Sequence, residues 1–75
     1  MKELVEYIAK AIVNSPDDVV VTEETGDQGV MLKLQVADED KGRVIGKQGR
    51  VAEAMRTLLR VTAAKQGVRA TLEIL

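Results

Sequence analysis

Apolar and polar residues alternate along the chain in two distinct periods, and these periods outline the secondary structure. Residues 2–14 carry apolar side chains three and four positions apart, which predicts an amphipathic helix that ends before Pro16. β-Branched residues at 19–22 predict a strand, and the polar stretch 25–29 predicts a turn. Strict alternation of apolar and polar residues over 30–36 then predicts a half-buried strand.

The second half of the chain predicts two helices and a last strand. A short helix is expected at 38–45, with the Asp38 carboxylate capping its first turn. A longer helix is expected at 50–66, closed by Gly67 in the left-handed conformation. Alternation over 68–74 predicts the final strand. The order helix–strand–strand–helix–helix–strand favours an α+β fold with a three-stranded sheet and the helices packed on one face.

Length and composition predict one domain over residues 1–75, with no linker or repeat. The chain has no cysteine or histidine, so it has no disulfides, thiolate chemistry or imidazole metal ligands. Its single serine, Ser15, precedes a proline, and no nucleophile–base pair stands out. The acidic groups, Asp38–Asp40 among them, are interpreted as surface charges in turns, at a cap or on an edge strand. We therefore expect a non-catalytic protein without metal or cofactor, and the lack of a long apolar run predicts a cytoplasmic location.

Charge is strongly segregated along the chain, although the net charge is only −1. Residues 1–40 carry three basic and ten acidic side chains, whereas residues 41–75 carry eight basic and two acidic ones. Solvated helix faces would also account for some of this charge. Segregation on this scale in a short chain nevertheless favours a basic surface that binds a polyanion.

The segment between the two predicted helices combines glycine with positive charge. Gly46 and Gly49 bracket Lys47, while Arg43 and Arg50 flank the pair. A plain joint between two helices would explain one glycine, because glycine adopts positive φ without strain. The basic residues favour a further role, in which the glycines let a sugar–phosphate backbone approach and the next helix offers its N-terminal N–H groups to a phosphate. The glycine spacing does not match a Walker loop, so nucleotide hydrolysis is not expected.

Residues 44–50, with the sequence VIGKQGR, resemble the Ile-Gly-x-x-Gly signature of the KH domain, an RNA-binding module. With the predicted order of elements, the whole chain is similar to the type II KH arrangement and to small bacterial KhpA-type RNA-binding proteins. The resemblance implies that single-stranded RNA is held by the loop and an adjacent aliphatic groove. It assigns RNA binding to eight consecutive residues, which are the loop and its flanks: Arg43, Val44, Ile45, Gly46, Lys47, Gln48, Gly49 and Arg50. Val36 is expected beside the groove.

The last helix carries more apolar side chains than contact with one sheet requires. Its expected core row has a spacing of three and four: Val51, Met55, Leu58 and Thr62. Ala54 and Val61 lie on the far edge of this stripe and are predicted to contact a second helix. The resemblance implies a homodimer or a pairing with a larger KH-containing partner. Arg56 and Arg60 either extend the basic surface or are ordinary solvated charges.

Two functions are therefore considered. The first is a small RNA-binding regulator of the RNA-chaperone kind, which acts after transcription through the glycine loop. The alternative is a protein-interaction adaptor that dimerises through the last helix, with RNA binding incidental. No membrane or small-molecule partner is expected.

Overall fold

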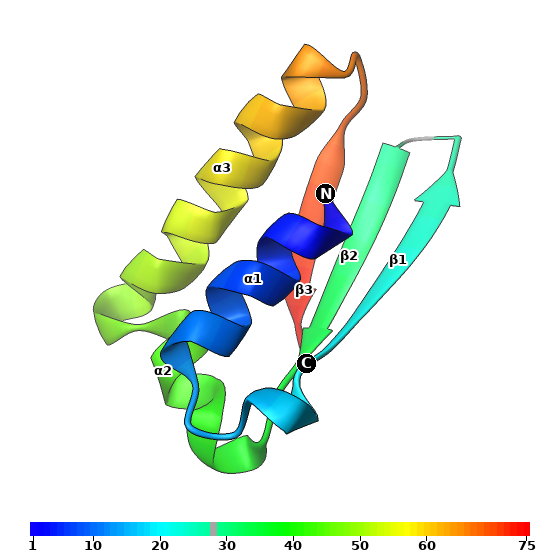
Figure 1. The fold of residues 1–75 in the computed structure, drawn as a ribbon. Helices are drawn as coiled ribbons and strands as arrows, with labels where there is room; N and C mark the ends of the chain where they lie inside the picture. The colour runs from blue at the N-terminus through cyan, green and yellow to red at the C-terminus, as the bar shows by residue number, and fades with distance from the viewer. Residues whose placement is uncertain (28) are drawn as a thin grey trace.

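The computed structural model describes residues 1–27 and 29–75 and confirms the predicted order of helices and strands (Figure 1). The bounds of the helices and strands are α1 Lys2–Ile12, β1 Val20–Gly26, β2 Gly29–Gln35, α2 Lys41–Ile45, α3 Arg50–Lys65 and β3 Ala70–Ile74. Short 3₁₀ turns precede β1, α2 and α3, at Pro16–Asp18, Asp38–Asp40 and Lys47–Gly49.

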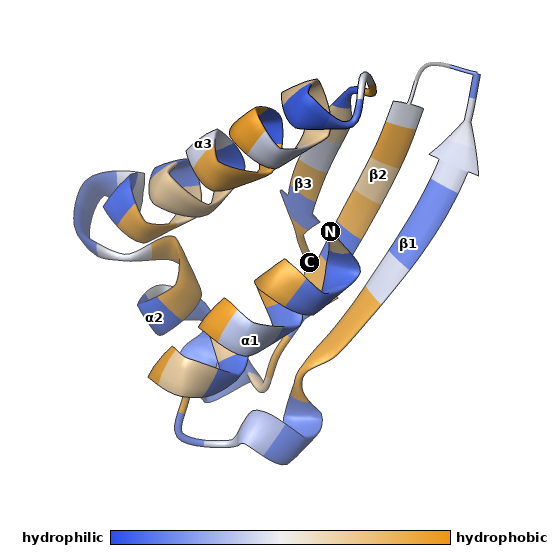
Figure 2. Ribbon diagram, turned by 45° about the horizontal axis from the view of Figure 1, so that its top comes forward, coloured by the Kyte–Doolittle hydropathy of each residue, from blue (hydrophilic) through white to orange (hydrophobic). Residues whose placement is uncertain are grey.

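The three strands form one sheet in the order β1–β2–β3. β1 and β2 run antiparallel, from the pair Val20 and Gln35 to the pair Gly26 and Gly29. β3 runs parallel to β2, so the chain must cross from one end of the sheet to the other between them, and α2 and α3 make that crossover. The helices cover one face of the sheet, and the other face is left open (Figures 1 and 2).

The hydrophobic core lies between the helices and the covered face of the sheet. Leu32 and Leu34 of β2 are fully buried at its centre, which confirms the inward face predicted from the alternation over 30–36. Helix α1 contributes Val5 and Ala9, and Figure 2 shows apolar residues along the central strand. The other buried apolar residues are Val19, Val21, Val36, Val44, Ala52, Met55, Leu59, Ala63 and Leu72.

The core-facing side of helix α3 is rotated from the predicted one: Met55 is buried and Val51 packs against the core as predicted, but Leu58 is not buried. The buried residues of α3 are Ala52, Met55, Leu59 and Ala63. Leu58, placed in the core row from the sequence, is 48% exposed, whereas Leu59 is only 1% exposed. The prediction for Leu58 was wrong because the apolar stripe of α3 is wide enough to fit two helical phases, and only packing against the sheet selects one of them.

The hairpin between β1 and β2 is also tighter than predicted. Thr25 and Gly26, assigned to a turn, belong to β1 and pair with Val30 and Gly29. The strand predicted at 19–22 therefore extends to Gly26. Gln28, which was placed in the same turn, lies outside the described residues.

Asp38 and Asp40 both differ from their predicted roles, and neither side chain caps α2. The Asp38 carboxylate caps no helix and instead pairs with Lys41 Nζ at 3.3 Å. Asp40 is fully buried, and its two carboxylate oxygens accept hydrogen bonds from the backbone N–H groups of Asn14, at 3.1 Å, and Ser15, at 3.0 Å. The interpretation of Asp40 as a surface charge was therefore wrong: it joins the segment after α1 to the beginning of α2.

Candidate nucleic-acid interface

The loop that joins α2 to α3 depends on three residues with positive φ. Gly46 has φ 77° and ψ 172°, Gln48 has φ 59°, and Gly49 has φ 75°. The Gly46 N–H donates to the Gly42 carbonyl at 2.8 Å and closes α2, while the Gly49 N–H donates to the Gly46 carbonyl at 3.1 Å. Gln48 is the one residue other than glycine with positive φ among residues 1–27 and 29–75. Such a conformation costs about 1 kcal/mol and is often kept at functional sites.

The two loop glycines are required for different reasons. A Cβ on Gly46 would lie 2.8 Å from Val51 Cβ and 2.9 Å from the Val51 backbone nitrogen, so no side chain fits there. A Cβ on Gly49 would meet no atom within 4 Å. Gly49 therefore leaves open space beside the main chain, at the N-cap of α3, and has no side chain that could accept the N–H groups of the first turn. The Arg50 N–H already donates to the Lys47 carbonyl, and the positive end of the helix dipole at this N-cap attracts an anion.

Three basic side chains surround this loop. Lys47 is exposed and, within the described part of the chain, forms no ion pair. Arg50 is exposed, and its Nη2 donates to Gln48 Oε1 at 3.2 Å. Arg43 Nε lies 3.8 Å from Asp40 Oδ1, so this guanidinium is partly neutralised by the buried carboxylate. The strongest unpaired positive charge of the loop therefore belongs to Lys47 and Arg50.

The aliphatic residues before the loop have separate positions. Val44 is fully buried in the core beneath the loop, whereas Ile45 is 41% exposed and lines a groove. Val36 lies in the core and does not line this groove, so the expectation that it would adjoin the groove was wrong. Of these aliphatic side chains, Ile45 is the one that offers substantial surface to a ligand.

The groove itself runs from the loop between α3 and β3 and has a volume of about 500 Å³. Gln48 and Gly49 lie at its loop end, next to Ile45. Its two long walls come from the first turns of α3, with Ala52, Glu53 and Arg56, and from β3, with Leu72, Glu73 and Ile74. Sequence reasoning missed the β3 wall, because only the parallel pairing of β3 with β2 places the end of β3 beside the loop.

The β3 wall also presents backbone groups to the groove. Among the residues that the structure describes, β3 pairs with β2 alone, so its other edge has no strand partner. The Arg69 carbonyl and the Leu75 N–H bond to β2, at 2.8 Å and 2.9 Å. The N–H and C=O groups of alternate residues point to opposite sides of a strand, so those of Leu72 and Ile74 point to the free edge. These groups are donors and acceptors of the kind that hydrogen-bond to the edges of bases.

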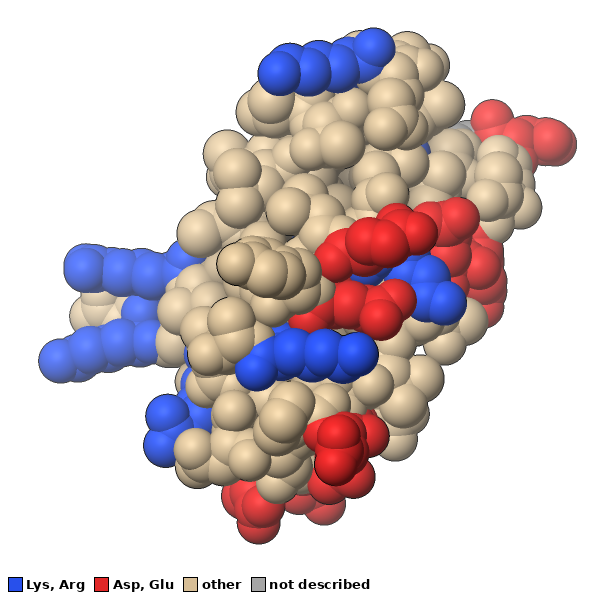
Figure 3. Space-filling model, in the orientation of Figure 1, with Lys and Arg blue, Asp and Glu red and all other residues tan. Residues whose placement is uncertain are grey.

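The loop lies on a basic edge of the face shown in Figure 3. In Figure 3, basic side chains gather on the side where Figure 1 places the turn between α2 and α3, and acidic side chains lie mostly on the rest of this face. The charge segregation in the sequence therefore corresponds to a segregation in space. A polyanion approaching the protein is attracted to the edge that carries the glycine loop.

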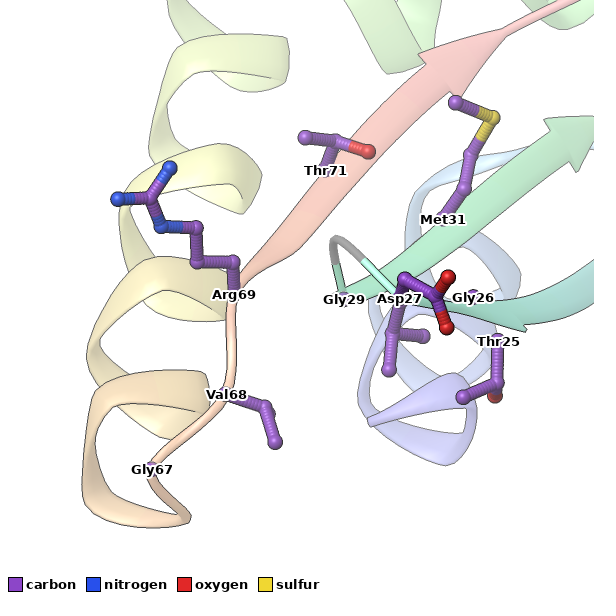
Figure 4. A pocket seen from close by; sticks show the side chains of 10 residues that line it. Thr25, Gly26, Asp27, Gly29, Met31, Gly67, Val68, Arg69 and Thr71 are labelled. Atoms are coloured by element: carbon purple, nitrogen blue, oxygen red, sulfur yellow. The ribbon is translucent and has the colours of Figure 1, made fainter.

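A second, larger hollow of about 920 Å³ lies at the opposite end of the sheet, between the β1–β2 hairpin and the beginning of β3 (Figure 4). Met31, Thr71 and Arg69 line it, and the Arg69 side chain extends away from the Asp27 carboxylate (Figure 4). It contains none of the predicted site residues.

Two general features of the described residues bear on function. In this part of the chain, no group of three or more acidic side chains is arranged to hold a metal ion. None of the helices in it has both the length and the apolar character needed to cross a bilayer.

The fold and the loop together define a KH domain, with a Gly-x-x-Gly loop between two helices over a three-stranded sheet. The family model described as KhpA/KhpB, KH domain matches residues 2–74, and the chain belongs to this family. It is 52% identical to the RNA-binding protein KhpA of Clostridium acetobutylicum over 75 residues, the full length of both chains. It is 49% identical to the RNA-binding protein KhpA of Treponema pallidum over 74 residues, which are 99% of this chain and 92% of that one.

The fold is also similar to part of a solved structure, that of Era in complex with MgGDPNP and nucleotides 1506–1542 of 16S ribosomal RNA. The TM-score is 0.59 and the sequence identity 19%, over 97% of this chain and 28% of the Era chain. The chain thus spans little more than a quarter of Era, and this likeness supports the type II KH fold alone.

Proposed function

We propose that this protein binds single-stranded RNA, without catalysis, through the Gly46–Gly49 loop and the groove between α3 and β3. It would act as a small RNA-binding regulator in the bacterial cytoplasm, with RNA-chaperone-like activity, as a homodimer or with a larger KH-containing partner. The relatives named RNA-binding protein KhpA support this function. The contacts would come from the residues predicted from the sequence, with Val44 supporting the loop from the core.

One observation carries the proposal: an open glycine turn at a helix N-terminus stands beside an open groove and unpaired basic side chains. Gly49 leaves room for a sugar–phosphate backbone, and the positive end of the α3 dipole attracts a phosphate. Lys47 and Arg50 attract the phosphates on either side. The groove then accepts the bases, and Ile45 gives them an apolar contact.

The charge count gives an expected strength for this interaction. On single-stranded nucleic acid, each phosphate contact contributes roughly −0.7 to the slope of log K against log salt concentration, where K is the binding constant. Three or four contacts therefore predict a slope of about −2 to −3. The chain has one aromatic residue, so stacking of bases on aromatic rings adds little. We therefore expect micromolar binding by one domain, which a second linked domain would strengthen.

The test is fluorescence anisotropy with a short labelled single-stranded RNA at two salt concentrations. The variant Lys47→Asp/Gln48→Asp should lose at least about tenfold in affinity, because two negative charges replace a phosphate contact. The chain supplies a matched control, since Lys65 and Gln66 are the same residue pair, both exposed, at the other end of α3. Lys65→Asp/Gln66→Asp should bind nearly as wild type does. Equal losses in both variants, or none in either, would reject the loop as the binding site.

A second candidate function is favoured by the outer face of α3. Leu58 and Val61 are both about half exposed there, and the neighbouring Ala54 is exposed as well. Apolar side chains arranged in this way on one helix suit contact with another helix. If the protein is chiefly an adaptor that assembles through Ala54 and Val61, acidic loop variants would keep their function in cells. A disruptive substitution at Val61 would then abolish it.

A further inference from the structure

Positive charge continues along the chain beyond the glycine loop. Residues 54–72, which include most of α3 and the beginning of β3, carry four basic side chains and no acidic one: Arg56, Arg60, Lys65 and Arg69. Arg56 Nη1 pairs with Glu53 Oε1 at 3.1 Å, so this arginine is already neutralised. The other three side chains are exposed and form no ion pair within residues 1–27 and 29–75. Their positions around the groove therefore decide which of them can meet RNA.

Arg60 lies on the groove side of α3. The three residues with which α3 lines the groove are Ala52, Glu53 and Arg56. Successive residues of a helix are turned by about 100°, which places Arg60 within the sector spanned by these three, one turn beyond Arg56. Arg56 and Leu72 mark the end of the groove that is distant from the loop. Arg60 therefore lies just past this end, on the α3 side.

Arg69 comes to the same end of the groove from β3. It precedes the strand, and its carbonyl accepts a 2.8 Å hydrogen bond from the Val30 N–H, which fixes its backbone. Its side chain starts on the open face of the sheet, as that of Thr71 does. In Figure 4 it then extends away from the β1–β2 hairpin, to the side of β3 on which α3 lies. A side chain in this position can meet a backbone phosphate at the rim of the groove.

Two exposed arginines at one end of the groove suit a phosphate. A guanidinium presents a planar fork of donors that matches phosphate oxygens, and its charge attracts the backbone of RNA. The negative end of the α3 dipole weakens this attraction only in the last turn, which begins after Arg60. Arg60 follows the Gly49 N-cap by about 16 Å along the helix axis, so a strand that passes both positions runs along the groove.

We propose that Arg60 and Arg69 form a second phosphate-binding position, at the end of the groove distant from the loop. The protein then holds the backbone of a single strand at both ends of the groove, with the bases between them. A KH loop clamps about four nucleotides, so the second position engages RNA that is longer than this. This inference rests on the proposed RNA-binding function and names the length of RNA that the same site takes.

The experiment compares labelled U4 and U10 RNA by fluorescence anisotropy. Arg60→Gln and Arg69→Gln should each weaken the binding of U10 about fivefold in about 0.1 M salt, the effect of one lost phosphate contact, and should leave the binding of U4 unchanged. The slope of log K against log salt concentration for U10 should become shallower by roughly 0.7 in each variant. Lys65→Gln is the matched control, because Lys65 is exposed on α3 but lies about 140° around the helix from Arg60. It removes the same charge and should bind both RNAs as the wild-type protein does.

The outcomes separate this inference from the function on which it rests. Wild-type binding of U10 by both arginine variants, or equal losses for U4 and U10, would overturn the second position while RNA binding stood. A loss confined to one variant would remove the other arginine from this position. A loss of the same size in Lys65→Gln would also overturn it, since the effect would then come from net charge. If wild-type protein bound neither RNA at any salt concentration, the proposed function would fail, and the inference with it.

Discussion

The backbone N–H of Ser15 donates a 3.0 Å hydrogen bond to the carboxylate of Asp40, 25 residues further along the chain. The Asn14 N–H binds the other oxygen, and no part of Asp40 is exposed. This contact ties the segment that leaves α1 to the turn that starts α2. Since α2 leads directly into the glycine loop, Asp40 helps to fix the position of the candidate RNA site relative to the core.

Replacing Asp40 should therefore destabilise the whole domain. Asp40→Ala leaves two N–H groups without an acceptor, and the free energy of unfolding should fall by about 3 kcal/mol. Asp40→Asn keeps one acceptor oxygen and should cost less. The measurement is urea unfolding followed by circular dichroism. Asp38→Ala is the control, because the Asp38 side chain is almost fully exposed, and it should change stability by no more than about 0.5 kcal/mol. If Asp40→Ala had the same free energy of unfolding as the wild-type protein, this account would be contradicted.

The three glycines around the loop should respond to alanine in a definite order. Gly42→Ala should stabilise the protein by about 0.5–1 kcal/mol, because Gly42 lies in α2 with no atom within 4 Å of the added Cβ. Gly49→Ala should cost about 1–2 kcal/mol, from the left-handed backbone alone. Gly46→Ala should cost the most, since its Cβ would collide with Val51. Urea midpoints of the three variants test the order, and equal losses at Gly46 and Gly49 would refute the close contact with Val51.

The sequence predicted the elements whose signal is local. Alternation over 30–36 identifies both the strand and its buried face, and Gly67 has the left-handed conformation expected at the end of α3, with φ 73°. The phase of α3 was not predictable in the same way. Rows through Leu58 and through Leu59 both have helical spacing, and only the position of the sheet shows that Leu59 is buried.

This difference between adjacent leucines gives a direct test of the packing. Leu59→Ala should lower the free energy of unfolding by about 3 kcal/mol, because it removes a fully buried side chain and leaves a cavity. Leu58→Ala makes the same chemical change at an exposed position and should cost less than about 1 kcal/mol. Thermal or urea unfolding of the purified variants measures both. If Leu58→Ala proved the more damaging, α3 would pack in the phase first predicted from the sequence.

The candidate site shows the same limit of prediction. The loop residues are contiguous, so glycine spacing and charge indicate Gly46–Gly49 from the sequence alone, and their contact with RNA stays a prediction. The opposite wall of the groove could not be found, because Glu73 comes beside the loop only through the parallel pairing of β2 and β3. Asp40 was missed for a related reason: its partners, Asn14 and Ser15, are distant in sequence, and an acidic residue in a turn is usually a surface charge.

The outer face of α3 gives the last prediction, which concerns assembly. If this face pairs with a second chain, Val61→Asp should weaken the dimer by about tenfold or more, because an unpaired carboxylate would be buried at the contact. Val20→Asp is a matched control, since Val61 and Val20 are 51% and 52% exposed in the single chain and Val20 lies on β1. Sedimentation equilibrium over a range of concentrations should show a monomer for Val61→Asp and the wild-type mass for Val20→Asp. An unchanged mass for Val61→Asp would remove Val61 from the interface. A wild-type protein that is monomeric throughout would mean that this face does not mediate a homodimer, and the search would move to a larger KH-containing partner.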